Sequence, residues 1–372
     1  MAGTKRAAPD FESHNLLTPP KLTHSDSDSS YKKDSSSPSS SDEDVPLHTS
    51  KWTRSLLDKL GVVIKETLPL QIINEWNLAT LPQSVLKEME TTSLKTTLCL
   101  RNIDFHSLEE IWEITRYDKD LVRLLKPDDF ESHSTLFGRC SFDDFLYALG
   151  CVLKVIEEKR EILEWQYQLL FDKFLQMFGI SSMHQPLMST KEAKIMSRTV
   201  FSQPDLLCTT SNPRTDRPIL FVCELTLDFH DCKVKKNQPV DETDDSPPSK
   251  KLRSKVSASS TASCKIPDHL LAQHVGELLV HMDESATSRA ILGMTVERTY
   301  VRITSLHINE KILEKVKFAD GTGSIHYDAE SERPSFFYSK AMNYLKKEDR
   351  IELIQSLLHI KMMQRKFETE MK

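Results

Sequence analysis

Residues 219–227 constrain the fold most strongly, because they read ILFVCELTL and place apolar side chains on both faces of a strand. Alternate residues of a strand point to opposite sides of its sheet. Apolar residues at nearly every position therefore predict a strand that is covered on both sides. Glu224 lies inside this segment, and a buried carboxylate costs free energy unless it is paired or bound to a metal ion. The segment predicts a layered core with a carboxyl group at its centre.

Three further segments place this strand in a sheet with helices around it. Residues 197–210 are rich in strand formers, and only a turn-like segment separates them from 217–227, so the two predict neighbouring strands. Residues 266–285 predict a helix, and residues 289–308 predict one or two more strands. The sequence therefore predicts a mixed α+β or α/β core flanked by helices.

Helical spacing of apolar residues dominates the rest of the chain. It occurs in 52–66, 69–78, 82–90, 106–115 and 118–125. Residues 142–178 predict one long helix or two, and 334–370 predict a helical tail with core candidates such as Phe336 and Leu345. We expect the region before the core to be all-helical.

Composition divides the chain into regions. The serine-rich acidic residues 1–50 and the polar residues 228–265 lack the apolar clusters needed to offset ordering entropy, so both predict disorder. Residues 51–160 then form the helical region. Residues 161–370 form the core, interrupted by the polar insertion.

Overall composition excludes several classes of protein. The longest apolar run is far shorter than the roughly 20 residues of a membrane span, and the N-terminus lacks the apolar stretch of a signal peptide. Seven cysteines without a CxxC pair fit a reducing compartment. The net charge of −6 gives no general attraction to nucleic acid, so such binding requires a local patch. We expect a soluble intracellular protein.

Asp205 and Glu224 are the acidic residues that the sequence places on adjacent strands. Asp205 follows Pro204 at the end of the first predicted strand, and Glu224 lies inside the second. Two carboxylates and a backbone carbonyl suffice for Mg²⁺, which prefers oxygen ligands and keeps several waters. Such an ion activates water and stabilises charge on a phosphodiester. The pair predicts a magnesium site for phosphodiester cleavage.

These motifs, in this order over about residues 161–308, resemble the PD-(D/E)XK nuclease superfamily, whose restriction-endonuclease-like fold is a mixed sheet core flanked by helices. In that family a helix precedes a strand that carries Asp, a strand that carries (D/E)-x-K, and a helix that often bears a glutamine. Pro204-Asp205 matches the first strand motif, and Glu224-Leu225-Thr226 falls at the second. The resemblance is to a divergent eukaryotic member.

The resemblance implies roles for further residues. Glu164 matches the glutamate that some families carry on the first helix, and Gln273 matches the helical glutamine. Thr226 stands where the family has a lysine that positions or activates the attacking water. Because threonine supplies no positive charge, the resemblance implies an incomplete catalytic site.

One strip of the helix at 266–285 carries polar residues. At 100° per residue, Gln273, His274, Glu277 and His281 fall together, opposite an apolar stripe. This strip is either a solvated face of an amphipathic helix or a face that lines the proposed site. A zinc site is not expected, because no third ligand accompanies the two histidines.

A short basic cluster lies in the polar insertion. Lys250, Lys251, Arg253 and Lys255 form a peptide that a nuclear import receptor can grip, so we expect nuclear residence. The cluster is otherwise a solvated charge run, or a set of salt-sensitive phosphate contacts.

Three functional interpretations remain open. The first is a nucleic-acid-associated protein, weakly active or inactive as a magnesium-dependent phosphodiesterase. The second is a non-catalytic interaction or scaffold module that retains the nuclease fold. In the third the match is accidental and the body is an unrelated interaction domain. The purely structural alternative for the two acids is that Asp205 only forms a turn and that Glu224 pairs with Arg217, Arg289 or Arg302.

Overall fold

The computed structural model describes residues 45–77, 105, 141–184, 188–210, 219–227, 265–321 and 323–370. All of them belong to one compact unit that runs from Glu43 to Lys372. Several expectations concern residues outside the described ones: the tail before Val45, the helices at 82–90, 106–115 and 118–125, and the insertion up to residue 264. The basic cluster of Lys250, Lys251, Arg253 and Lys255 also lies outside them.

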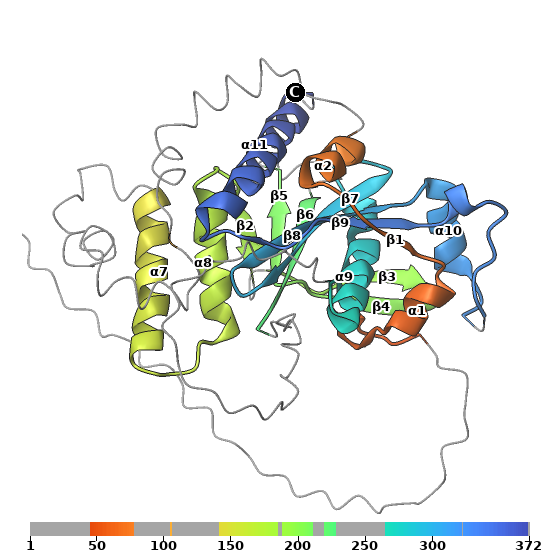
Figure 1. Ribbon diagram of the computed structural model, residues 1–372. Coiled ribbons are helices and arrows are strands. Elements are labelled where there is room, and N and C mark those ends of the chain that lie inside the picture. Colours follow the sequence, from red (N-terminus) through yellow and green to blue (C-terminus); the bar gives the residue numbers. More distant parts are fainter. Residues whose placement is uncertain are drawn as a thin grey trace, which may run out of the picture. The chain divides into compact units, whose positions relative to one another are not determined.

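A mixed sheet forms the centre of the described residues (Figure 1). Its eight strands follow the order β1-β9-β8-β7-β6-β5-β2, with β10 paired to β8 outside this path. The pairs β1–β9 and β6–β7 are parallel and the others are antiparallel. The strands are β1 (Val63–Glu66), β2 (Ser182–His184), β5 (Leu206–Thr209), β6 (Ile219–Thr226), β7 (Ala290–Glu297), β8 (Tyr300–His307), β9 (Ser335–Tyr338) and β10 (Met342–Asn343). The prediction of a mixed α+β fold is confirmed.

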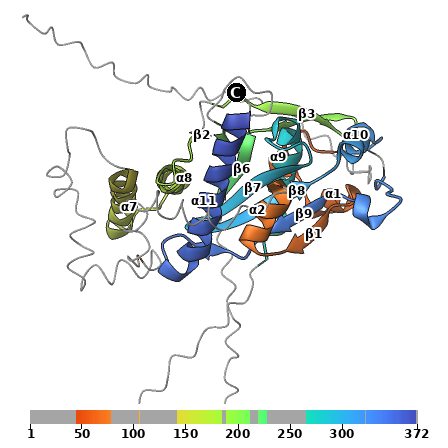
Figure 2. The ribbon, with the colours of Figure 1, turned by 90° about the horizontal axis from the view of Figure 1, so that it is seen from above.

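Helices cover both faces of this sheet. One core lies on the side of α2 (Pro69–Asn77), α7 (Ser141–Glu157), α8 (Glu164–Gln176) and α11 (Lys347–Glu370). The other core lies on the side of α1 (Arg54–Lys59), α9 (Asp268–His281), α10 (Glu310–Phe318) and a separate hairpin of β3 (Lys191–Ile195) and β4 (Arg198–Ser202). Short 3-10 turns occur at η1 (Thr49–Lys51), η4 (Met282–Glu284) and η5 (Glu330–Glu332). α2 and α11 lie above the sheet in Figure 1 and in front of it in Figure 2, which is seen from above.

β6 is the strand covered on both sides that the sequence predicts. Phe221, Cys223 and Leu225 point into the core of α8 and α11, whereas Val222 points into the core of α9. Every residue from Ile219 to Leu225 is buried. This two-sided burial holds the backbone around Glu224 rigidly between two layers of helices.

β1 contradicts the prediction of an all-helical region over 51–160. The helical pattern of 52–66 ends early, because α1 stops before Gly61, whose φ of +68° is the left-handed conformation that glycine adopts at helix ends. Val63 and Ile64 are β-branched and pair with Ser335 and Phe336 of β9. The region therefore contributes an edge strand to the central sheet.

The predicted helical tail at 334–370 is also wrong in its first part. The segment Ser335–Tyr338 contains SFFY, whose aromatic residues favour a strand, and it inserts between β1 and β8. Phe336 and Leu345 are buried as expected, although neither lies in a helix. α11 begins only at Lys347.

Two open alternatives are resolved by the structure. Residues 142–178 form two helices, α7 and α8, and residues 289–308 form two strands, β7 and β8. The predicted strands at 197–210 and 217–227 are neighbours through β5 and β6, while β4 belongs to the separate hairpin.

The compact unit begins before the predicted boundary at residue 50. Val45 is buried, and the amide of Phe201 donates a hydrogen bond of 2.7 Å to the carbonyl of Leu47. Trp52 is buried against α9, where a Cβ added to Gly276 would lie 2.8 Å from its indole ring. The N-terminal segment thus covers the side of α9 that faces away from the sheet.

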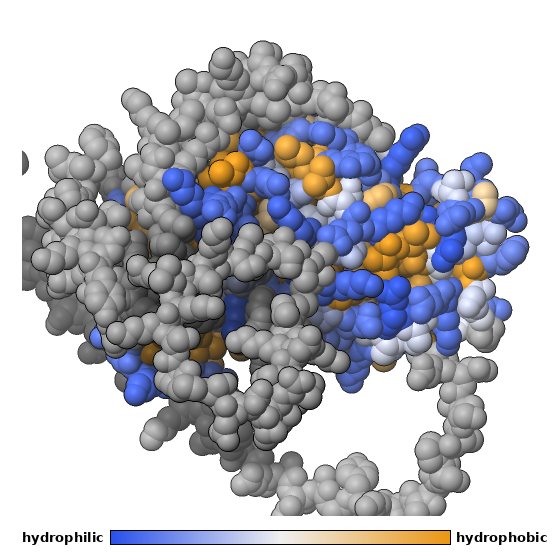
Figure 3. Space-filling model, viewed as in Figure 1, coloured by the Kyte–Doolittle hydropathy of each residue, from blue (hydrophilic) through white to orange (hydrophobic). Residues whose placement is uncertain are grey.

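Among the described residues, no helix is both long and apolar enough to cross a bilayer. In the face drawn in Figure 3, apolar side chains are interspersed with hydrophilic ones. The buried apolar residues of the described unit form the two cores on either side of the sheet.

Candidate functional site

Asp205, Glu224 and Gln273 meet where β5, β6 and α9 come together. The antiparallel register pairs Leu206 with Cys223, so Asp205, just before β5, stands across from Glu224. Oδ2 of Asp205 accepts a hydrogen bond of 2.7 Å from the amide of Leu225, and Nε2 of Gln273 donates to Oε1 of Glu224. Three of the predicted site residues are therefore in one place.

Glu277 is a further member of this group that sequence reasoning did not select as a candidate ligand. It lies one helical turn after Gln273, whose Nε2 donates to its Oε1 at 3.1 Å. The residue is 1% exposed, and its Oε2 has no hydrogen-bond partner among the described residues. The spacing of four residues from Gln273 on one helix face was the signal that could have found it. We call Asp205, Glu224 and Glu277, with Gln273, the acidic site.

Glu164 and Thr226 lie at the border of the acidic site. Glu164 is the first residue of α8 and is exposed, yet its charge raises the pKa of both Asp205 and Glu224. One turn later, Nε2 of Gln168 donates to the carbonyl of Asp205 at 2.6 Å, which fixes the start of α8 against the site. Thr226 ends β6 and is half-buried.

Two carboxyl groups of the acidic site, those of Asp205 and Glu224, have raised pKa values. Burial raises the pKa of Asp205 from 3.8 to about 7; the Leu225 amide opposes this shift, and the charges of Glu164 and Glu277 add to it. Burial also raises the pKa of Glu224 well above its ordinary value, and the charges of Glu277 and Asp205 reinforce the effect. Burial therefore favours the neutral form of Glu224, and Asp205, whose pKa is about 7, is close to half-protonated at neutral pH.

Buried acids elsewhere in the described residues have partners that satisfy them. Asp172 accepts hydrogen bonds from Ser182 and from Gln176, and Glu297 forms an ion pair with Arg302. No Lys or Arg of the described part of the chain forms an ion pair with Asp205, Glu224 or Glu277; the nearest basic contact is Nδ1 of His274, 3.7 Å from Oε2 of Glu277. Crowding of like groups, rather than charge compensation, distinguishes the acidic site.

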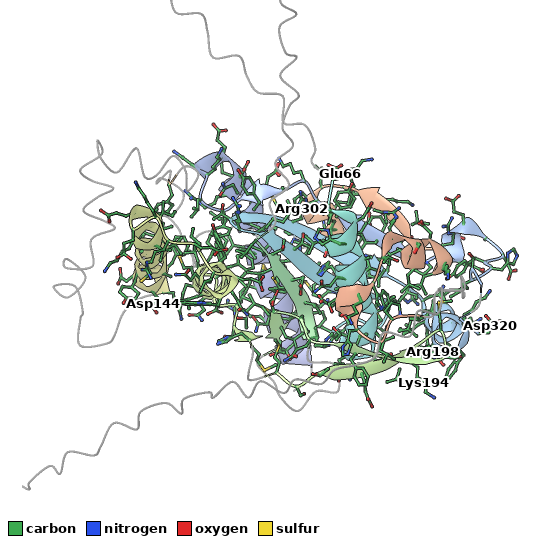
Figure 4. The ribbon with its side chains drawn as sticks, turned by 90° about the horizontal axis from the view of Figure 1, so that it is seen from below. Glu66, Asp144, Lys194, Arg198, Arg302 and Asp320 are labelled. Atoms are coloured by element: carbon green, nitrogen blue, oxygen red, sulfur yellow. The ribbon has the colours of Figure 1, made fainter. Side chains whose placement is uncertain are left out.

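Of the three suggested arginine partners of Glu224, the structure describes Arg289 and Arg302, and neither pairs with Glu224. Arg302 is buried and engages Glu297, and Glu66 also acts on its charge. Figure 4 shows Glu66 and Arg302 next to each other, apart from Lys194, Arg198 and Asp320. Burial lowers the pKa of Arg302 to about 10. Arg217 lies outside the described residues, and Arg289 forms no hydrogen bond or ion pair with Glu224.

The polar strip of α9 does not face solvent. His274, Glu277 and His281 are all buried, so the solvated-face alternative is wrong. His274 Nε2 lies 2.8 Å from Oγ1 of Thr304 on β8, while Gln273 and Glu277 meet Glu224 on β6. The strip packs on the sheet because η1, α1 and the β3–β4 hairpin cover the opposite, apolar side of the helix.

The side chains of the described residues contain no cluster of three or more His, Cys, Asp or Glu residues at metal-ligand spacing. Comparison of the sequence with protein-family models and with curated proteins gives no match. The functional argument therefore rests on the acidic site itself.

Proposed function

We propose that this chain is a nucleic-acid-associated protein whose core derives from a PD-(D/E)XK-type nuclease, and that it cleaves phosphodiesters slowly or not at all. The acidic site is the main evidence for the proposal, because its three carboxyl groups lie close together in the interior. None of them has a Lys or Arg partner among the described residues. Burying like charges together costs free energy. Perturbed carboxyl groups of this kind are typical of cation-binding and catalytic sites.

The order of the elements around the acidic site supports the same proposal. α8, β5 with Asp205 at its start, β6 with Glu224, α9 with Gln273, and β7 follow one another along the chain. The sequence resemblance implies this order of helix, Asp strand, Glu strand and helix with glutamine. A restriction-endonuclease-like arrangement of the mixed sheet is therefore part of the proposal.

Magnesium fits the chemistry of the donors in the acidic site. Asp205 and Glu224 would hold the ion through carboxyl oxygens, the ligand type that Mg²⁺ prefers, with water filling further positions. The buried Oε2 of Glu277, which lacks a hydrogen bond among the described residues, adds a further acidic group beside the two proposed ligands. A bound Mg²⁺ ion supplies water activation and stabilises negative charge on a phosphodiester.

The protein's own residues have separate tasks in this proposal. Gln273 holds the carboxyl groups of Glu224 and Glu277 in place through Nε2. The Leu225 amide orients Asp205. Glu164 contributes a carboxylate from the exposed end of α8. Thr226 offers only a neutral hydroxyl, and loss of one preorganised group typically costs roughly 10²–10³-fold in rate.

The second candidate is a non-catalytic interaction or scaffold module on the same fold. Thr226 favours it, because the position next to the acidic site lacks the charge that the family's lysine provides. In this case the acidic site binds a cation without cleaving a substrate, and the fold serves to bind a partner.

Single-turnover cleavage of DNA and RNA oligonucleotides with Mg²⁺ or Mn²⁺ tests the catalytic part of the proposal. The wild type should be slow, Asp205→Ala and Glu224→Ala slower still, and Thr226→Lys faster. Fast wild-type cleavage that either alanine abolishes would overturn the incomplete-site interpretation. Cleavage indifferent to all three substitutions would remove the acidic site from the reaction.

A further inference from the structure

Arg298 lies at the same end of the sheet as the acidic site. β6 and β7 are parallel and pair Thr226 with Glu297, so their carboxyl ends lie side by side. Arg298 follows Glu297 directly and begins the two-residue turn into β8. Its amide donates to the carbonyl of Thr226 at 3.2 Å, and its Nε donates to the carbonyl of Leu227 at 3.1 Å. The guanidinium is thus fixed to the end of the strand that carries Glu224.

The turn itself does not explain an arginine at this position. Arg298 has a φ of +58°, in the left-handed region where a side chain is strained and where hairpin turns favour glycine or asparagine. A glycine here would keep the amide hydrogen bond to Thr226 and would lose only the hydrogen bond from Nε to Leu227. The side chain, rather than the backbone conformation, is what this residue adds.

Unlike Arg302, Arg298 forms no ion pair with an acidic residue of the described part of the chain. Arg302, four residues further, is held by Glu297 and by the nearby charge of Glu66. Among the described residues, Arg298 forms no ion pair, and its Nη nitrogens have no hydrogen-bond partner. A guanidinium anchored through Nε keeps those nitrogens for the paired hydrogen bonds that phosphate accepts.

We propose that Arg298 binds a backbone phosphate of nucleic acid held at the acidic site, and so supplies from the β7–β8 turn the positive charge that Thr226 lacks. The inference rests on the proposed function. Leu227, the anchor of the guanidinium, is three residues beyond Glu224, or about 10 Å along the strand. This separation assigns Arg298 to substrate binding next to the reacting phosphate and not to proton transfer.

Fluorescence anisotropy with labelled DNA and RNA oligonucleotides, single- and double-stranded, tests this assignment on the full chain in Ca²⁺ or Mg²⁺. Arg298→Gly should weaken binding roughly tenfold or more and reduce the slope of log K against log salt by about 0.7–0.9. The same variant should unfold at an equal or higher temperature, because it removes the strained conformation. Arg298→Lys should retain part of the affinity.

Lys311→Ala is the matched control. It removes one positive charge from the exposed side of α10, which follows β8 and therefore lies at the opposite end of the sheet. Wild-type binding that is unchanged in Arg298→Gly, or reduced equally by Lys311→Ala, would overturn the role of Arg298 and leave the proposed function standing. A wild type that binds none of the oligonucleotides would overturn both.

Discussion

At the scale of single residues, Asp205 is held in place by hydrogen bonds from two neutral amide groups and not by an opposite charge. The Leu225 amide binds its Oδ2, and Gln168 binds its carbonyl oxygen. The amide lowers the pKa of Asp205, but burial outweighs it and brings that pKa to about 7. The fold therefore tolerates Asp205 best when its carboxyl group is neutral.

This proton affinity predicts how Asp205→Asn changes stability. In the unfolded chain Asp titrates near 3.9, so between about pH 4 and 7 the native state binds more protons than the unfolded state. The free energy of unfolding of the wild type should then fall as pH rises through this window. Asparagine keeps the acceptor for Leu225 without ionising, so Asp205→Asn should be more stable at pH 8, by on the order of 2 kcal/mol.

Urea unfolding at pH 5 and pH 8, in the presence of a chelator, measures this effect. The advantage of Asp205→Asn should be larger at pH 8 than at pH 5. A variant less stable than the wild type at pH 8 would show that Asp205 is a stabilising ionised group, contrary to its buried environment.

At the scale of elements, the contact between α9 and the sheet positions Gln273 and Glu277. Gly293 of β7 permits it, since an added Cβ would lie 2.5 Å from Nε2 of His274 and 2.6 Å from Oγ1 of Thr304. These atoms form the hydrogen bond between α9 and β8. The helix approaches the strands this closely because β7 has no side chain at that point.

Gly293→Ala should therefore push α9 away from the sheet. We expect a loss of about 1–3 kcal/mol in the free energy of unfolding, the usual cost of overpacking a core. Gly323→Ala is the control, because a Cβ there meets no atom within 4 Å. Chemical denaturation of both variants checks the prediction. Equal stability of the two would show that α9 can accommodate a methyl group on β7.

Local patterns in the sequence predicted the elements that carry the acidic site better than the edges of the sheet. The nearly continuous apolar run of 219–227 and the helical spacing of 266–285 lie within single segments, so both patterns predicted β6 and α9 directly. β1 and β9 could not, because their strand pairing joins Val63 to Ser335, far apart in sequence. Glu277 was not selected as a site residue because helical spacing alone does not tell which face of α9 is covered by the N-terminal segment.

At the scale of the whole molecule, several separate parts of the chain converge on one end of the sheet. The start of α8, the start of β5, the end of β6 and the β7–β8 turn contribute Glu164, Asp205, Glu224 and Arg298. The N-terminal segment around Trp52 covers α9 from behind and keeps it on the sheet. In the proposed function, the central acids bind a cation and the arginine at the border binds a phosphodiester backbone.

The central claim is that Asp205 and Glu224 form a divalent-cation site, and calorimetric titration of the full chain with Mg²⁺ tests it most directly. Binding should be tighter at pH 8 than at pH 6 and should release protons, because the raised pKa values of both carboxyl groups leave protons to be displaced. Asp205→Asn and Glu224→Gln should each weaken binding about tenfold or more, whereas Glu310→Gln, an exposed acid on α10, should not. Absence of binding by the wild type, or equal affinity in all four proteins, would contradict the account.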